Sequence, residues 1–194
     1  MSSNFPMKNE RHPTLLNRET SLLIVVDMQE PFLGVIHGRD ALTANVILLC
    51  QAARLLNIPI IATEQYAERM GTVVPEISAV FGEQTVPIDK LSFSCAESPK
   101  FQKALAAAGR HQVVVCGVET HICVSQTAHD LLHAGYRVHV PADGVSSRTL
   151  EKHKLGMERI RDGQIKPCAT EAVVYEWLRE AGTPEFKEIL KLVK

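Results

Sequence analysis

The strongest constraint on the fold is an alternation of short, continuous apolar runs with longer helical stretches. The apolar runs are rich in β-branched residues and occupy residues 22–26, 58–62, 113–115, 138–140 and, more weakly, 165–168. Continuous apolarity over so short a length is typical of strands buried on both faces. The helical stretches between them lie at residues 42–56, 101–108, 122–134 and 150–161. Each is long enough to connect parallel strands, so we predict an α/β fold with a doubly wound, mainly parallel sheet and helices on both faces.

The length and composition fit one domain. The chain has 194 residues, of which 45% are apolar and 22% charged, and it contains no internal repeat or low-complexity tract. We predict a single domain over residues 1–194, with its core at about residues 20–180 and C-terminal helices at 171–180 and 184–193. Residues 65–90 are the irregular part, with at most one short helix. A long connection of this kind often shapes a ligand pocket.

Charge, hydropathy and cysteine content limit the partners. The formal net charge is −1 with both signs intermixed, so no basic field attracts nucleic acid or anionic lipid. No stretch reaches the roughly 18 to 20 apolar residues of a membrane helix, and the polar start lacks the apolar region of a signal peptide. The five cysteines are odd in number and form no CxxC pair, which suits reduced thiols. We predict a cytoplasmic protein that binds a small molecule and neither nucleic acid nor membrane.

Asp27 is the first candidate for chemistry. Ligand sites of open parallel sheets lie beyond the carboxyl ends of the strands, and Asp27 directly follows the first apolar run. A carboxylate beside so apolar a strand is partly desolvated, which suits a proton acceptor. A cap of the following turn is an equally good interpretation from position alone.

Cys123 is the second candidate. Residues 113–123 carry a predicted strand through a turn into a helix, with Thr120 as the expected N-cap and Cys123 at the third helical position. Unpaired N–H groups and the helix dipole would favour a thiolate there, and hence a nucleophile. The other cysteines, at positions 50, 95, 116 and 168, are expected to be small buried residues.

Lys90 is the third candidate, although by itself it would be interpreted as a surface lysine. It precedes Leu91 and Phe93, so its stem could pack on the core while its ammonium group meets the site. An ammonium near Asp27 and Cys123 would hold both in their charged forms.

Together these residues resemble a known family. Three parts of the chain match, in order, the D-x-Q, K and G-x-x-T-x-x-C-V signatures of isochorismatase-like cysteine hydrolases. They are Val25-Val26-Asp27-Met28-Gln29, the single residue Lys90, and Gly117 to Val124. The resemblance covers roughly residues 20–180 and includes the strand and loop at 136–149. It implies a three-layer, Rossmann-like fold and a homo-oligomer, for which the apolar faces of the helices from His121 and Leu150 are candidates.

The resemblance also implies a mechanism. Cys123 would attack a carbonyl carbon, Asp27 would take the thiol proton and pass it to the leaving group, and Lys90 would stabilise the charged pair. Water would then hydrolyse the acyl-enzyme. A cis peptide between Val118 and Glu119 would direct the backbone N–H of Glu119, together with that of Cys123, at the oxyanion.

The substrate class is resolved only in part. Cys123 favours a small amide, ureido or related carbonyl substrate, and residues 65–75 contain no histidine, which argues against the metal-containing nicotinamidases of this family. The segment around Thr63 and Tyr66 resembles family hydrolases of unassigned substrate. Two alternatives stay open: a vinyl-ether hydrolase of the isochorismate type, with Asp27 as general acid, and a non-catalytic redox or scaffold protein.

Residues near the predicted strand ends are candidates for the pocket wall: Phe32, Gln65, Tyr66, Phe93 and the side chain of Glu119. We expect no cofactor, because no phosphate-binding glycine motif follows a predicted strand. We also expect no metal. His129 and His133 have the i, i+4 spacing of zinc ligands, but they are expected on a solvated or subunit-contact face.

Overall fold

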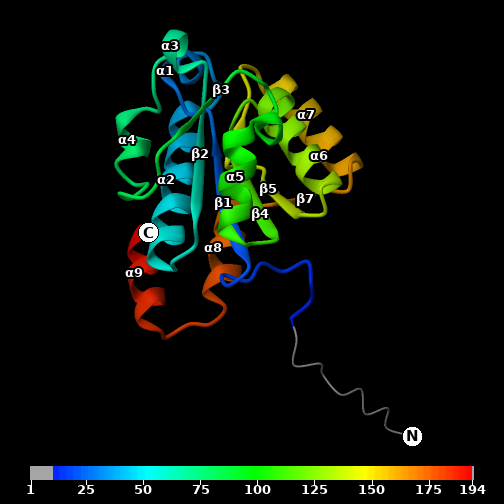
Figure 1. The fold of residues 1–194 in the computed structure, drawn as a ribbon. Helices are drawn as coiled ribbons and strands as arrows, with labels where there is room; N and C mark the ends of the chain where they lie inside the picture. Colours follow the sequence, from blue (N-terminus) through cyan, green and yellow to red (C-terminus); the bar gives the residue numbers. More distant parts are fainter. Residues whose placement is uncertain (1–10, 194) are drawn as a thin grey trace, which may run out of the picture.

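The computed structural model describes residues 11–193, which form a three-layer α/β structure (Figure 1). Lys194 and residues 1–10, which include most of the polar start where no signal peptide is predicted, lie outside the described residues. None of the described helices is long and apolar enough to cross a bilayer.

The central sheet has seven strands, and every pairing is parallel. Its order is β3-β2-β1-β4-β5-β7, with β6 beside the end of β4. The strands are β1 (Ser21–Val26), β2 (Ile60–Gln65), β3 (Ile88–Lys90), β4 (Gln112–Val118), β5 (Arg137–Pro141), β6 (Val145–Ser146) and β7 (Lys166–Cys168). The doubly wound parallel sheet predicted from the sequence is therefore confirmed.

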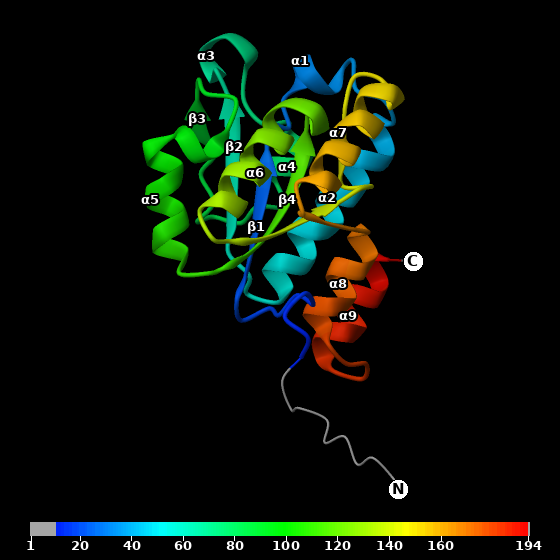
Figure 2. The same ribbon diagram turned by 90° about the vertical axis from the view of Figure 1, so that its right-hand side faces the viewer.

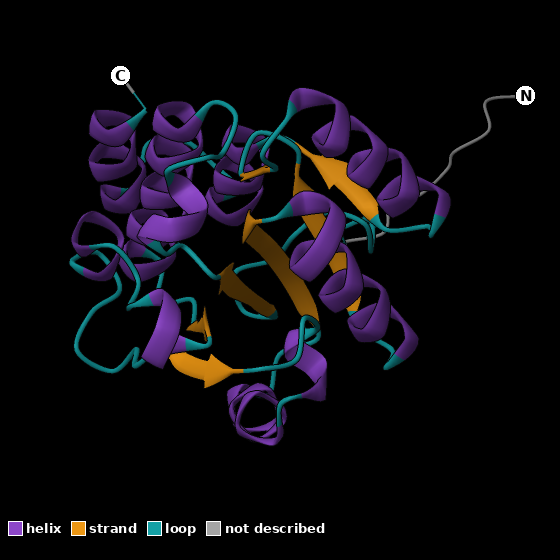
Figure 3. Cartoon of the chain, turned by 90° about the horizontal axis from the view of Figure 1, so that it is seen from above, coloured by secondary structure: helices purple, strands orange, loops and turns teal. Residues whose placement is uncertain are grey.

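Alternation along the buried strands divides the core into two layers. In β1, Leu23 and Val25 belong to one cluster, while Leu22, Ile24 and Val26 belong to the other. The first cluster is covered by α2 (Arg39–Leu55), α8 (Thr170–Leu178) and α9 (Pro184–Leu192). The second is covered by α5 (Pro99–Ala108), α6 (Ser125–His133) and α7 (Leu150–Asp162). Figures 2 and 3 show the sheet between these two sets of helices.

The short elements depart from the prediction. Residues 65–90 contain two short helices, α3 (Ala67–Met70) and α4 (Pro75–Ser78), where at most one was expected. Gly71, with φ +74°, ends α3, and Pro75 starts α4. These two residues, which interrupt regular structure in the sequence, therefore mark the boundaries of short helices. Two further short elements are α1 (Glu30–Leu33) and the 3₁₀ turn η1 (Cys95–Glu97). The π-helical turn η2 (Thr120–Val124) comes before α6 in the helix predicted at 122–134.

Two glycines let the segments that carry the site approach each other. Gly117, near the end of β4, has φ +108°, and a Cβ atom there would clash with the carbonyl oxygen of Val26 in β1. A Cβ atom on Gly156 of α7 would lie 2.9 Å from the His121 backbone nitrogen in η2. Close packing at these two points brings the end of β1, η2 and α7 together.

Candidate active site

Asp27 lies at the turn that follows β1. It is 1% exposed, and its φ of 52° is a left-handed conformation that residues other than glycine rarely adopt, although aspartate tolerates it better than most. Its N–H donates to the Thr63 carbonyl oxygen of β2 at 3.2 Å, and its own carbonyl oxygen accepts from the Gln29 N–H at 2.8 Å. Bonds on both sides of the residue therefore fix this turn.

The carboxylate of Asp27 is held by a lysine and a threonine. Oδ2 accepts from Lys90 Nζ at 2.8 Å, and Oδ1 accepts from Thr63 Oγ1 at 2.7 Å. The side chains of Lys90 and Asp27 are 0% and 2% exposed. Burial opposes the charge on Lys90, but the Asp27 carboxylate, Cys95 and Cys123 together outweigh it, so the pKa of Lys90 is raised. The two residues form a buried ion pair, as the sequence argument required.

Gln65 supports this ion pair. Its Oε1 accepts from Lys90 Nζ at 2.6 Å, and its Nε2 donates to the Leu91 carbonyl oxygen at 2.8 Å. The backbone N–H of Gln65 donates in turn to Gln29 Oε1 at 2.7 Å. Gln65 was predicted as a substrate contact, yet both ends of its amide already have partners. Thr63 and Gln29 were not predicted as supporting residues, although Gln29 belongs to the quoted Asp-x-Gln motif.

Cys123 lies in η2, which begins after Glu119 rather than after Thr120. The expected N-cap bond of Thr120 is absent, and its Oγ1 lies 3.0 Å from His153 Nδ1 instead. The peptide bond between Val118 and Glu119 is cis. The Glu119 carbonyl oxygen accepts from the N–H groups of Ile122 at 3.0 Å and Val124 at 3.2 Å. The prediction that Thr120 caps an α-helix with Cys123 at its third position was wrong, because the turn is π-wound and starts one residue earlier.

The surroundings of Cys123 also oppose the resting thiolate that its position in the sequence suggested. The residue is 7% exposed. Burial and the nearby Asp27 carboxylate raise the pKa of the Cys123 thiol well above the usual range, and the opposite influence of Lys90 is smaller. Lys90 is already paired with Asp27, so little positive charge remains to stabilise a second anion. The resting site therefore contains a neutral thiol beside a carboxylate.

This charge state predicts how Cys123 responds to alkylation. With iodoacetamide, we expect slow reaction at pH 7 and a rate that climbs through pH 9, because only the thiolate reacts. Asp27→Asn should accelerate alkylation at pH 7 at least severalfold, since it removes the charge that raises the thiol pKa. Lys90→Met should slow it. The measurement is peptide mass spectrometry at several pH values, and a fast rate that stays constant from pH 5 to 8 would show a resting thiolate instead.

A pocket of about 250 Å³ opens at this end of the sheet. It is lined by Asp27, Phe32, Gln65, Phe93, Val118, Glu119, Ile122, Cys123 and Arg148. Its volume is below that of pockets for drug-sized ligands, so it suits a small molecule. Phe93 is 56% exposed and forms an open part of the wall.

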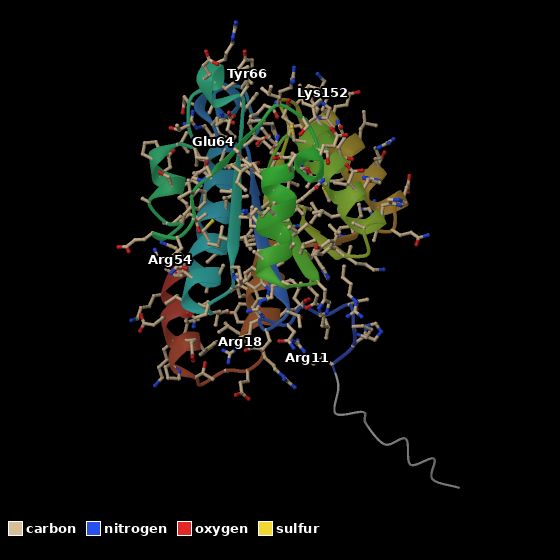
Figure 4. The ribbon with its side chains drawn as sticks, viewed as in Figure 1. Arg11, Arg18, Arg54, Glu64, Tyr66 and Lys152 are labelled. Carbon is tan, nitrogen blue, oxygen red and sulfur yellow. The ribbon has the colours of Figure 1, made fainter. Side chains whose placement is uncertain are left out.

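Tyr66 is the predicted wall residue that does not line this pocket. Its backbone is left-handed, with φ 48°, and its ring centroid lies 5.7 Å from the guanidinium carbon of Arg69. Figure 4 shows Tyr66 near the upper end of the molecule. The other four predicted wall residues do line the pocket, and their contact with substrate stays a prediction.

A second ion pair borders the pocket. The Glu119 carboxylate accepts from the Arg148 backbone N–H at 2.9 Å, from Nε at 3.1 Å and from Nη2 at 2.6 Å. Burial opposes the charge of Glu119, but these bonds outweigh it and lower the pKa of its carboxyl group. The site has no net formal charge, because each of its two carboxylates is paired with one cation: Asp27 with Lys90, and Glu119 with Arg148. Arg148 was not predicted as a site residue, although it belongs to the loop included in the family resemblance.

The two histidines considered as zinc ligands lie on α6. His129 Nδ1 is 2.7 Å from the Ser125 carbonyl oxygen, one turn earlier in the helix, and His133 is exposed. Within residues 11–193, no three His, Cys, Asp or Glu side chains are grouped to hold a metal ion.

Comparison with known proteins shows that most of the chain is similar to one family. A family model described as the isochorismatase domain matches residues 21–172. The secreted isochorismatase effector Isc1 of Phytophthora sojae is 39% identical over 179 residues, which cover 90% of this chain and 85% of the relative. The structure of a protein named MAR1 ribonuclease from Caenorhabditis elegans is 34% identical, covers 92% of both chains and superposes with a TM-score of 0.87. The YcaC gene product of Escherichia coli, described as an octameric hydrolase of unknown specificity, has the same TM-score at 22% identity, with 94% and 92% covered.

Proposed function

Because the chain belongs to the isochorismatase family of hydrolases, we propose that it cleaves a small amide, ureido or related carbonyl compound with Cys123 as nucleophile. The observation that carries this proposal is the buried ion pair of Asp27 with Lys90, in which Asp27 lines the same small pocket as Cys123. A thiol, a proton acceptor and a fixed cation are the groups that acyl transfer to sulfur requires.

The first half of the reaction transfers the acyl group to sulfur. The Cys123 proton moves to Asp27 as the sulfur attacks the carbonyl carbon, so the thiolate exists only during attack. The carbonyl oxygen becomes an oxyanion that the backbone N–H groups of Glu119 and Cys123 stabilise. Asp27 then gives the proton to the leaving nitrogen, the carbon–nitrogen bond breaks, and a thioester remains.

The second half restores the enzyme. Asp27, ionised again, accepts a proton from water as the water oxygen attacks the thioester carbon. The carbon–sulfur bond breaks, the acid product leaves and the proton returns to the sulfur of Cys123. Lys90 stays protonated throughout and keeps the carboxylate ionised between the two steps.

The pocket favours a small substrate without net charge. Four apolar side chains, Phe32, Phe93, Val118 and Ile122, form much of the wall, and the two ion pairs cancel. A volume of about 250 Å³ fits a few heavy atoms around one carbonyl group. The ribonuclease name of the Caenorhabditis elegans neighbour raises RNA as another substrate. A neutral pocket in a chain of net charge −1 does not favour a polyanion.

The experiment is a turnover screen of the full chain against small amides and ureido compounds, with ammonia release as the readout. A vinyl ether and an RNA oligonucleotide belong in the same panel, and chromatography of their products is the readout for these two compounds. Turnover of an amide or ureido compound supports the proposal. Turnover of the vinyl ether or RNA alone, or of no compound, counts against it and favours the vinyl-ether, ribonuclease or non-catalytic interpretation.

Asp27→Asn tests the proton acceptor. We expect kcat to fall by about 10²- to 10⁴-fold, because asparagine cannot take the thiol proton. The same variant should alkylate faster, as described above, so activity and thiol reactivity should change in opposite directions. Asp162→Asn, an exposed carboxylate at the end of α7, is the control and should keep normal kcat. Unchanged kcat in Asp27→Asn would remove Asp27 from the mechanism.

Assembly and location belong to the same proposal. Leu150 and Leu155 of α7 are 44% and 57% exposed, which supports a homo-oligomer through this helix. The octameric Escherichia coli neighbour is an example of assembly on this fold. The Phytophthora sojae relative is named a secreted effector, and a cytoplasmic location of the present chain stays a prediction.

A further inference from the structure

A second hollow lies at the opposite end of the sheet, where the strands begin. It has a volume of about 330 Å³. Its lining residues are Arg11, His12, Pro13, Leu15, Asn17, Thr20, His111, Gln112, Arg137 and Arg179. Gln112 starts β4 and Arg137 starts β5, so the hollow lies under the amino ends of these strands. Figure 4 shows Arg11 near the lower end of the molecule, far from Tyr66.

The charged residues that line this hollow are of one sign, although Arg11 and Arg179 also border a neighbouring hollow that contains glutamates, among them Glu176. Arg11, Arg137 and Arg179 contribute three guanidinium groups, two histidines add further donors, and no carboxylate is among the lining residues. None of the three arginines forms an ion pair within residues 11–193. Arg11 Nη1 instead donates to the carbonyl oxygens of Leu16 and Glu176, at 2.7 and 2.8 Å. These contacts orient a guanidinium group without neutralising it.

The wall that carries Arg11 and His12 is fixed to the body of the domain. The buried Gln112 side chain accepts from the Asn17 N–H at 2.9 Å and donates to the Leu15 carbonyl oxygen at 2.9 Å. Glu176 Oε2 accepts from the Leu16 N–H at 2.7 Å, and the Leu16 side chain is fully buried. The segment before β1 therefore forms a fixed rim across the end of the sheet.

Arg179 occupies a backbone position better suited to glycine. It ends α8 with φ +70°, a left-handed conformation that a side chain disfavours, and its own side chain is exposed. Glycine at this position would relax the backbone and remove the guanidinium group. Arg179→Gly should therefore leave the fold at least as stable while it removes one positive charge from the hollow.

We propose that this basic hollow binds a small phosphate monoester. Guanidinium groups recognise phosphate oxygens through paired charge-assisted hydrogen bonds. The three arginines supply such donors from three separate segments of the chain, and no ion pair within residues 11–193 occupies them. The volume exceeds that of a phosphate group and leaves room for a small organic part beside Leu15 and Pro13. The site is distinct from the pocket of Cys123, so its occupation does not depend on the hydrolytic reaction.

The test is isothermal titration calorimetry of the full chain with inorganic phosphate and with glycerol 3-phosphate, at constant ionic strength in chloride. We expect saturable binding of both in the millimolar range or tighter. Arg137→Gln and Arg179→Gly should each weaken binding at least about fivefold. Arg69→Gln, an exposed arginine outside the hollow, is the matched control and should leave binding unchanged.

Thermal unfolding separates loss of the site from loss of the fold. Arg179→Gly should keep or raise Tm while it loses affinity, because glycine suits the backbone there. Absence of saturable binding to the parent protein would overturn the proposal. Binding that survives both substitutions, or that falls equally in Arg69→Gln, would also overturn it, because the anion would then lie elsewhere.

Discussion

Replacing Cys123 with alanine is expected to lower turnover of an amide or ureido substrate by at least about 10⁴-fold. Alanine cannot form the thioester, and the remaining groups could only direct water at the carbonyl carbon. The oxyanion donors would still be present, so a small residual rate is expected. The measurement is kcat/KM for the parent protein and the variant on the same substrate.

Cys116→Ala is the matched control for this substitution. Cys116 lies on β4 and is fully buried, whereas Cys123 is 7% exposed, and the Cys116 side chain belongs to the core cluster of the opposite sheet face. Both substitutions remove one sulfur atom from the core, so they should cost similar stability. Cys116→Ala should keep its activity. Full activity in Cys123→Ala would remove Cys123 from the mechanism. The thiol would then be incidental, as it is in the vinyl-ether alternative with Asp27 as general acid.

Replacing Lys90 with methionine is expected to have the largest effect on folding. The Asp27 carboxylate is 2% exposed at its side chain, and its Oδ2 accepts the bond from Lys90. Methionine fills similar space but leaves this carboxylate buried without a counter-charge. We expect the free energy of unfolding at pH 7 to fall by about 3–5 kcal/mol, as measured by urea denaturation.

The double variant Lys90→Met with Asp27→Asn isolates the cause. When both charges are removed, no buried charge is left unpaired, so the double variant should be more stable than Lys90→Met alone. Activity should be absent in both. Strictly additive losses of stability would mean that the two side chains do not interact, which would contradict the buried ion pair.

The part of the fold buried on both faces could be predicted from the sequence. β1 and β4 appear as continuous apolar runs because side chains on each face pack against a helical layer. β3 was missed because its three residues, Ile88–Lys90, include two charged ones at the sheet edge. β6 was missed because it has only two residues.

For the site, strand ends and the family resemblance pointed to Asp27, Lys90 and Cys123. Charge compensation explained why an ammonium group would be needed near Asp27, although Lys90 by itself would be interpreted as a surface residue. The protonation of Cys123 could not be predicted, because it depends on burial and on the distance of Asp27, which the order of residues does not give. The same reason applies to Arg148, whose bonds to Glu119 join two loops that are 29 positions apart.

The most direct test of the central proposal is the mass of the protein during turnover. The protein is mixed with an activated ester or amide, quenched in acid before the reaction ends, and analysed as intact protein and as peptides. We predict one acyl group on the peptide that contains Cys123, lost when turnover is complete and absent in Cys123→Ala. An acyl group on another residue would contradict a Cys123 acyl-enzyme. Turnover that proceeds without any adduct and continues in Cys123→Ala would contradict it as well.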